Sequence, residues 1–159
     1  MSLNLINLDE STRKYMLKEI ELDLASGNLF YSSRLSDKGK QDYPRLLKDA
    51  SQLYDIAWLS NSLRSNGRIK IEESRRTRSG GYSIAKVPGT APDTLAEGEF
   101  NRFYIRGLCL RAIEEEIDDL VIYRAKLVDR PRSESELMIG RVIKVKSLLQ
   151  DIRTHPGTV

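Results

Sequence analysis

The chain has 159 residues and a formal net charge of +3, and 40% of its residues are hydrophobic and 31% charged. This length and composition are typical of one globular domain that buries its own core, and they exclude a disordered chain. No apolar run approaches the roughly 18 residues that cross a membrane, and the single cysteine, Cys109, excludes an internal disulfide and fits a reducing compartment.

The N-terminal third of the chain has the apolar spacing of helices. Asp9 is a suitable N-cap for a helix over residues 10–26, because its carboxylate can accept hydrogen bonds from the free amides of the first turn. Pro44 favours the start of a second helix, since proline is tolerated at the first helical position. A third helix is expected over residues 52–65, and the short apolar segment 29–31 predicts a strand or an extended linker.

In the middle of the chain the apolar period changes from that of a helix to that of a strand. Apolar and polar residues alternate over 68–72 and again over 82–84, as in strands with one buried face. The Ser-Gly-Gly sequence at 79–81 is a turn signal. We therefore predict a β-hairpin over residues 68–87 with a long basic tip, followed by a loop over 88–92.

The second half of the chain begins with the longest predicted helix, over about residues 95–116. Its wide apolar face indicates a central, buried position. Residues 120–128 predict a strand that is apolar on both faces at its start and is therefore expected inside the fold. A capping box at residues 133–136 predicts a short helix that ends near Gly140. Apolar spacing over 145–152 predicts a last short helix.

These elements predict an α+β fold in a single domain that spans residues 1–159. Its N-terminal part, residues 1–66, is expected to be helical, and residues 67–159 form the α+β part. We expect one small sheet that contains the basic hairpin and the buried 120–128 strand, packed on the long central helix at about 95–116.

The basic hairpin is the strongest indication of function. The stretch 64–86 holds seven basic and two acidic residues, and the hairpin tip carries three arginines close together. Arginine and lysine side chains on an exposed loop can pair with phosphates and displace counterions. The alternatives are a protein partner, or a loop whose charge only keeps the protein soluble. The candidate residues for binding nucleic acid or a partner are Arg68, Lys70, Arg75, Arg76, Arg78 and Lys86.

Three helices followed by a basic hairpin is also the element order of a winged helix-turn-helix. In that interpretation the helix over residues 53–64 would enter the major groove of DNA, and the hairpin would contact the DNA backbone. Few polar side chains of this helix are suited to reading base edges, which argues against this detailed interpretation.

Two arginines lie one turn apart in the long helix, with Glu99 and Asn101 nearby. Arg102 and Arg106 form a candidate anion site, because guanidinium groups can hold an anion through paired hydrogen bonds. The structural alternative is that both arginines pair with neighbouring carboxylates and hold the helix in place. An enzyme of unrecognised type built around the two arginines is a further alternative.

Motifs for catalysis and for metal binding are absent or incomplete. The acidic pair at 118–119 and the strand 122–126 have the order of a metal-dependent nuclease, but Arg124 stands where the second carboxylate would bind the metal. Cys109 lies in the apolar helix and the only histidine, His155, lies near the end of the chain, so a Cys–His pair is not expected. We expect no catalytic residue, metal site or cofactor.

Two stretches of the chain resemble motifs of small uncharacterised proteins from bacteria and their phages. The first is Glu99–Cys109, with the sequence EFNRFYIRGLC, and the second is Tyr123–Glu136, which begins with YRAK and ends with PRSESE. The similarity runs over most of the chain. No activity is established for that group, so the resemblance implies a bacterial or phage setting and assigns no role to any residue.

We therefore expect a non-enzymatic binding protein that contacts nucleic acid through the basic hairpin. The main alternative is a structural or assembly protein of a phage virion, such as a capsid or connector component. In that alternative the chain forms a homo-oligomer, and the basic loop is an arm that reaches a neighbouring subunit. The expected location is the bacterial cytoplasm, or the virion in the second case, and no membrane partner is expected.

Overall fold

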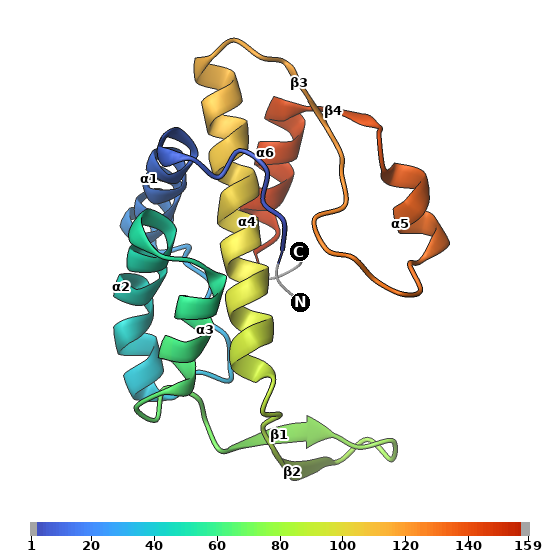
Figure 1. Cartoon of the computed structure of the whole chain (residues 1–159). Coiled ribbons are helices and arrows are strands. Elements are labelled where there is room, and N and C mark those ends of the chain that lie inside the picture. Colours follow the sequence, from blue (N-terminus) through green and yellow to red (C-terminus); the bar gives the residue numbers. More distant parts are fainter. Residues whose placement is uncertain (1–2, 157–159) are drawn as a thin grey trace.

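The structure, a computed structural model, describes residues 3–156 and has an α+β fold (Figure 1), so the predicted fold class is confirmed. No helix among the described residues is long and apolar enough to cross a membrane. In chain order the elements are α1 (Glu10–Ser26), α2 (Asp37–Leu53), α3 (Ile56–Arg64), β1 (Glu72–Arg76), β2 (Tyr82–Lys86), α4 (Ala91–Glu114), β3 (Asp119–Val121), α5 (Ser133–Met138), β4 (Val142–Lys144) and α6 (Val145–Thr154).

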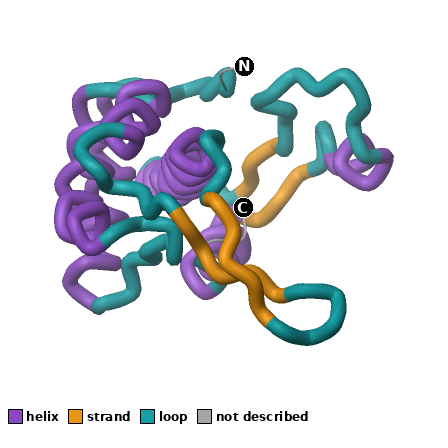
Figure 2. Tube along the Cα trace, turned by 90° about the horizontal axis from the view of Figure 1, so that it is seen from below, coloured by secondary structure: helices purple, strands orange, loops and turns teal. Residues whose placement is uncertain are grey.

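The long helix α4 lies at the centre of the fold, as its apolar face predicts. Helices α1 and α3 pack against one side of it, and α6 packs against another side (Figures 1 and 2). Helix α2 packs on α1 and α3. Helix α4 starts four residues before the predicted position 95, because Pro92 is tolerated in its first turn.

The main core lies between α4 and the three N-terminal helices. Helices α1 and α4 approach closely at Gly107, where a Cβ atom would lie 2.7 Å from Cγ and 3.0 Å from the backbone nitrogen of Met16. Glycine is therefore required at this position by the space between the two helices. The residues of the main core are Met16, Ile20, Leu29, Leu35, Tyr43, Leu46, Leu47, Ala50, Leu59, Leu63, Ala96, Phe100, Phe103 and Tyr104.

Side-chain caps set the starts of the N-terminal helices. The Asp9 carboxylate accepts a hydrogen bond from the Thr12 amide at 2.9 Å, which confirms the predicted start of α1. Ser36 caps α2, so this helix begins earlier than predicted and Pro44 lies inside it. Helix α3 begins later than predicted because Asp55 caps it. The apolar segment 29–31 forms neither a helix nor a strand.

The strands form two separate antiparallel pairs, β1–β2 and β3–β4. The prediction of one sheet with a buried strand over 120–128 is therefore wrong. This strand is limited to residues 119–121, it pairs with β4, and its Val121 is 62% exposed. An apolar run lies in the interior only where other layers cover both of its faces. Here Leu120 rests on a small core beside α6, and the opposite face is open to solvent.

Cys109 belongs to this small second core, together with Ala112 of α4 and with Val145 and Leu149 of α6. The thiol is fully buried, and burial, with a smaller contribution from Glu19, raises the pKa of Cys109 to about 12. Because the thiolate is the reactive form, this thiol is both shielded and poorly nucleophilic at neutral pH.

We therefore expect native protein to react with a thiol-labelling reagent only as fast as it unfolds, and urea-unfolded protein to react at once. A Cys109→Ala variant that carries Ser79→Cys provides the control, since Ser79 is exposed in the hairpin turn and should label rapidly in the native state. Rapid labelling of Cys109 in the native protein would contradict its position between α4 and α6.

Candidate functional site

The candidate site is the β1–β2 hairpin, which extends away from the helices (Figure 2). Its two strands pair in register from Glu72 opposite Lys86 to Arg76 opposite Tyr82. The turn at the tip is closed by a hydrogen bond of 2.7 Å from the Thr77 amide to the Gly81 carbonyl. Gly80 has a φ of 88°, a left-handed conformation that favours glycine. The predicted hairpin and its turn are thus confirmed, with shorter strands than expected.

The base of the hairpin is held to the helical part of the fold. The carboxylate of Glu73 accepts two hydrogen bonds from the Arg34 guanidinium, at 2.8 and 3.1 Å. The Lys70 amide donates to the Arg34 carbonyl at 2.9 Å, and Val87, directly after β2, is buried. Beyond this base the strands are mostly exposed, so the hairpin is anchored at its base and open to solvent along its length.

Two of the six candidate cations form ion pairs with carboxylates of the same chain. Arg68 is 9% exposed, and its guanidinium donates to Asp42 at 2.8 Å and to the Ser62 carbonyl at 2.7 Å. Arg68 links the base of the hairpin to α2 and α3 and is not available to a partner. The predicted binding surface therefore does not include Arg68. Arg75 pairs with Glu73 at 2.8 Å and is 47% exposed. Its charge is already balanced in part.

The other four candidate cations are exposed, and none of them makes a side-chain hydrogen bond or ion pair with a described residue. Two of them lie in the strands, one in the turn and one just before β1. The hairpin therefore carries a positive charge that the described part of the chain does not neutralise. These residues are Lys70, Arg76, Arg78 and Lys86.

One face of the hairpin combines cations with apolar side chains. Residues opposite each other in an antiparallel pair project from the same face, so Arg76 lies beside Tyr82, and Ser74 beside Ile84. Tyr82 is 75% and Ile84 76% exposed. The alternation of these residues predicts a half-buried strand, but no second layer packs on the hairpin within the described structure. The alternation shows which residues share a face of the hairpin, but it does not show whether another element packs on that face. The exposure of Tyr82 and Ile84 could therefore not be predicted from the sequence.

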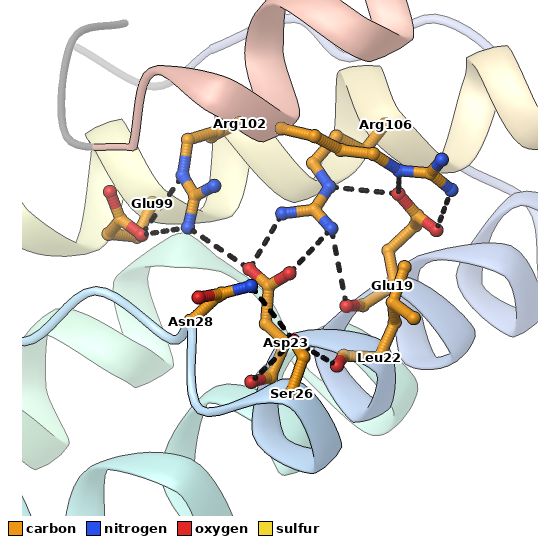
Figure 3. Close-up of polar contacts among 9 residues, drawn as sticks. Glu19, Leu22, Asp23, Ser26, Asn28, Glu99, Arg102 and Arg106 are labelled. Atoms are coloured by element: carbon orange, nitrogen blue, oxygen red, sulfur yellow. Dashed lines mark hydrogen bonds and ion pairs between the residues drawn. The ribbon is translucent and has the colours of Figure 1, made fainter.

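The second candidate site, at Arg102 and Arg106, lies inside the fold (Figure 3). Nε of Arg106 donates to Glu19 at 2.9 Å, and its two terminal nitrogens donate to Asp23 at 2.7 and 2.8 Å. Arg102 donates to Glu99 at 2.8 and 3.2 Å. Arg106 thus pairs from α4 to α1, whereas Arg102 pairs with Glu99 of its own helix and lies 3.9 Å from Asp23 of α1. Both arginines are held in internal ion pairs, as the structural alternative predicts.

Helix α6 joins this buried network through Arg153, which donates to both carboxylate oxygens of Glu19 at 2.7 and 2.8 Å. Burial raises the pKa of Glu19, but hydrogen bonds from Arg153 and Arg106 together hold it below its usual value of 4.5. Burial raises the pKa of Glu99, and the hydrogen bond from Arg102 offsets this in part. Three arginines and three carboxylates therefore form one network, in which Arg102 and Arg106 are fully buried and Arg153 is 37% exposed.

The acidic residues around β3 do not assemble a metal site. No group of three or more histidine, cysteine, aspartate or glutamate side chains within residues 3–156 is arranged to hold a metal ion. Asp119 pairs with Lys144 at 2.7 Å, and Arg124 pairs with Glu136 at 2.8 Å. Two of the residues that have the order of a nuclease, Asp119 and Arg124, are thus engaged in ion pairs on the surface.

Comparisons with models of protein families, with curated proteins and with solved structures found no match to this chain.

Proposed function

We propose that the chain is a non-enzymatic binding protein that contacts nucleic acid through the β1–β2 hairpin. The observation that carries the proposal is a set of four exposed cations, on the projecting hairpin or just before it, that pair with no described residue: Lys70, Arg76, Arg78 and Lys86. Phosphates of a nucleic acid would pair with these cations, and the release of condensed counterions would favour binding.

The form of the hairpin supports the same proposal. An isolated two-stranded hairpin is only marginally stable in water, so exposed strands of this kind gain stability from a partner. The anchored base, at Arg34 and Glu73, holds the strands out from the body, so a long polyanion meets no obstacle from the helices. Such binding also requires no deep pocket and no metal.

The proposal is tested by a triple variant, Arg76→Ala with Arg78→Ala and Lys86→Ala. We expect weaker binding to every oligonucleotide sequence, measured by fluorescence anisotropy of dye-labelled strands. The slope of log affinity against log salt should become shallower by about 0.7–0.9 for each phosphate contact that is lost. The free energy of unfolding should change by less than about 0.5 kcal/mol, because all three side chains are exposed.

The matched control removes three exposed cations elsewhere, Arg130, Arg132 and Arg141, on the projecting segment between β3 and β4. Both triple variants have the same net charge, so a nonspecific charge effect would weaken them equally. Equal weakening would contradict a site on the hairpin. If the wild-type protein binds neither single strands nor duplexes at low salt, the proposed function is wrong.

A second candidate function is assembly with other protein subunits, and a separate observation favours it. The segment 127–141 also projects from the fold (Figure 1), and α5 within it has no buried residue. Leu127 is 79% and Leu137 67% exposed. Apolar side chains gathered on a projecting segment are typical of protein contacts. A mass in solution that rises with concentration, and that falls on Leu127→Ser with Leu137→Ser, would support this candidate.

A further inference from the structure

One face of the hairpin indicates which kind of nucleic acid it binds, an inference that rests on the proposed function. On one face of the hairpin, Tyr82 stands opposite Arg76 and two residues before Ile84, and Lys86 follows on the same face, opposite Glu72. The ring of Tyr82 makes no aromatic contact with another described residue and is three-quarters exposed. The most exposed aromatic side chain of this region thus lies among its unpaired cations.

The side chains of this face fit a single strand better than a duplex. A two-stranded ribbon is narrow enough to enter the major groove of DNA, where arginine, asparagine and glutamine read base edges. Among those residue types this face offers Arg76 alone, and it offers no side-chain amide. In a duplex the bases are stacked on one another, so the faces of their rings are not available to Tyr82. In a single strand a base can stack on an aromatic ring while cations track the backbone.

We propose that Tyr82 is a stacking platform for a base of single-stranded nucleic acid, with Arg76, opposite Tyr82, and Lys86, beyond Ile84, pairing with phosphates along the strand. Every base has a ring face, so the platform tolerates any sequence. Ile84 extends the apolar surface for a neighbouring base. The hairpin thereby favours single-stranded DNA or RNA over a duplex of the same sequence.

The test compares Tyr82→Ala with Tyr82→Phe, which keeps the ring and removes the hydroxyl. The ligands are dye-labelled oligothymidylate, oligouridylate and a mixed-sequence DNA duplex, and the measurement is fluorescence anisotropy. We expect Tyr82→Ala to weaken binding to a single strand by roughly 5-fold to 100-fold, the usual effect of losing one stacked base, and Tyr82→Phe to bind as the wild type does. Leu127→Ala, which removes an equally exposed apolar side chain from the other projecting segment, should have no effect.

The salt dependence separates stacking from charge. Removal of the ring should leave the slope of log affinity against log salt unchanged, whereas the triple charge variant makes it shallower. Weakening of both the thymidylate and the uridylate complex by Tyr82→Ala would support the stacking role, and the tighter of the two wild-type complexes would indicate whether the ligand is DNA or RNA. If the wild type binds the duplex as tightly as the single strands and Tyr82→Ala changes neither, the inference is overturned while the proposed function stands. If no nucleic acid binds at all, both are wrong.

Discussion

Replacement of Arg106 by leucine is expected to lower the free energy of unfolding by about 3–5 kcal/mol, the usual cost of removing one partner of a buried ion pair. The Arg106 side chain has no exposed surface, and its guanidinium makes contacts of 2.7–2.9 Å with Glu19 and Asp23. Leucine would leave the Asp23 carboxylate inside the fold, with Arg102 as a remaining partner at 3.9 Å. Urea unfolding followed by circular dichroism measures the effect.

The control for this prediction is Arg45→Leu, which breaks an exposed ion pair of 3.5 Å between Arg45 and Asp49 in α2. That change should cost less than about 1 kcal/mol, because exposed pairs contribute little. A double variant, Arg106→Leu with Asp23→Leu, should lose less stability than the sum of the two single changes, since it removes both members of a pair. Additive losses would contradict a direct pair between α1 and α4.

The same network makes a prediction for pH. The pKa of Glu19 is held below 4.5 in the folded protein. A carboxyl group with a lowered folded pKa contributes stability that is present above the unfolded pKa and is lost as the pH falls through the folded pKa. Since Arg106 is one cause of that shift, the difference in stability between wild type and Arg106→Leu should shrink on acidification below pH 4.5. A difference that grows on acidification would contradict this ion pair.

The second large effect is expected for Gly39→Ala at the start of α2. A Cβ atom at Gly39 would overlap the carbonyl oxygen of Arg68 and lie 2.9 Å from its carbonyl carbon. That carbonyl already accepts a hydrogen bond from the Ser36 amide at 2.9 Å, so it cannot move without weakening this bond. Overpacking usually costs about 1–3 kcal/mol of stability. We expect Gly39→Ala to lower the free energy of unfolding by about 3 kcal/mol or more, because the overlapping atoms belong to the backbone.

Gly98→Ala in α4 is the matched control, because it makes the same chemical change in a helix with no atom within 4 Å of the new Cβ. Alanine is the better helix former, so this variant should gain about 0.5–1 kcal/mol. The two variants should therefore change the thermal midpoint in opposite directions in differential scanning calorimetry. If both variants gain stability, the base of the hairpin does not lie against α2 as described.

The elements that could be predicted from the sequence are those set by local interactions. The cap at Asp9 acts on an amide three residues away, and the apolar period of the following residues defines the buried side of α1. The central position of α4 also follows from its own residues, because an apolar face this wide must be covered. The hairpin turn follows from the glycines at 80 and 81, since residue 80 needs a left-handed backbone.

The remaining features depend on residues that are distant in the sequence, and only the tertiary structure decides them. The partners of Arg106 lie 83 and 87 residues away, so local sequence leaves its role open between an anion site and an internal ion pair. The burial of Arg68 depends in the same way on Asp42, 26 residues before it. Alternation likewise cannot tell whether a layer covers a strand. Tyr82 and Val121 lie in apolar patterns, yet both are exposed, because burial requires a second element that packs on that face.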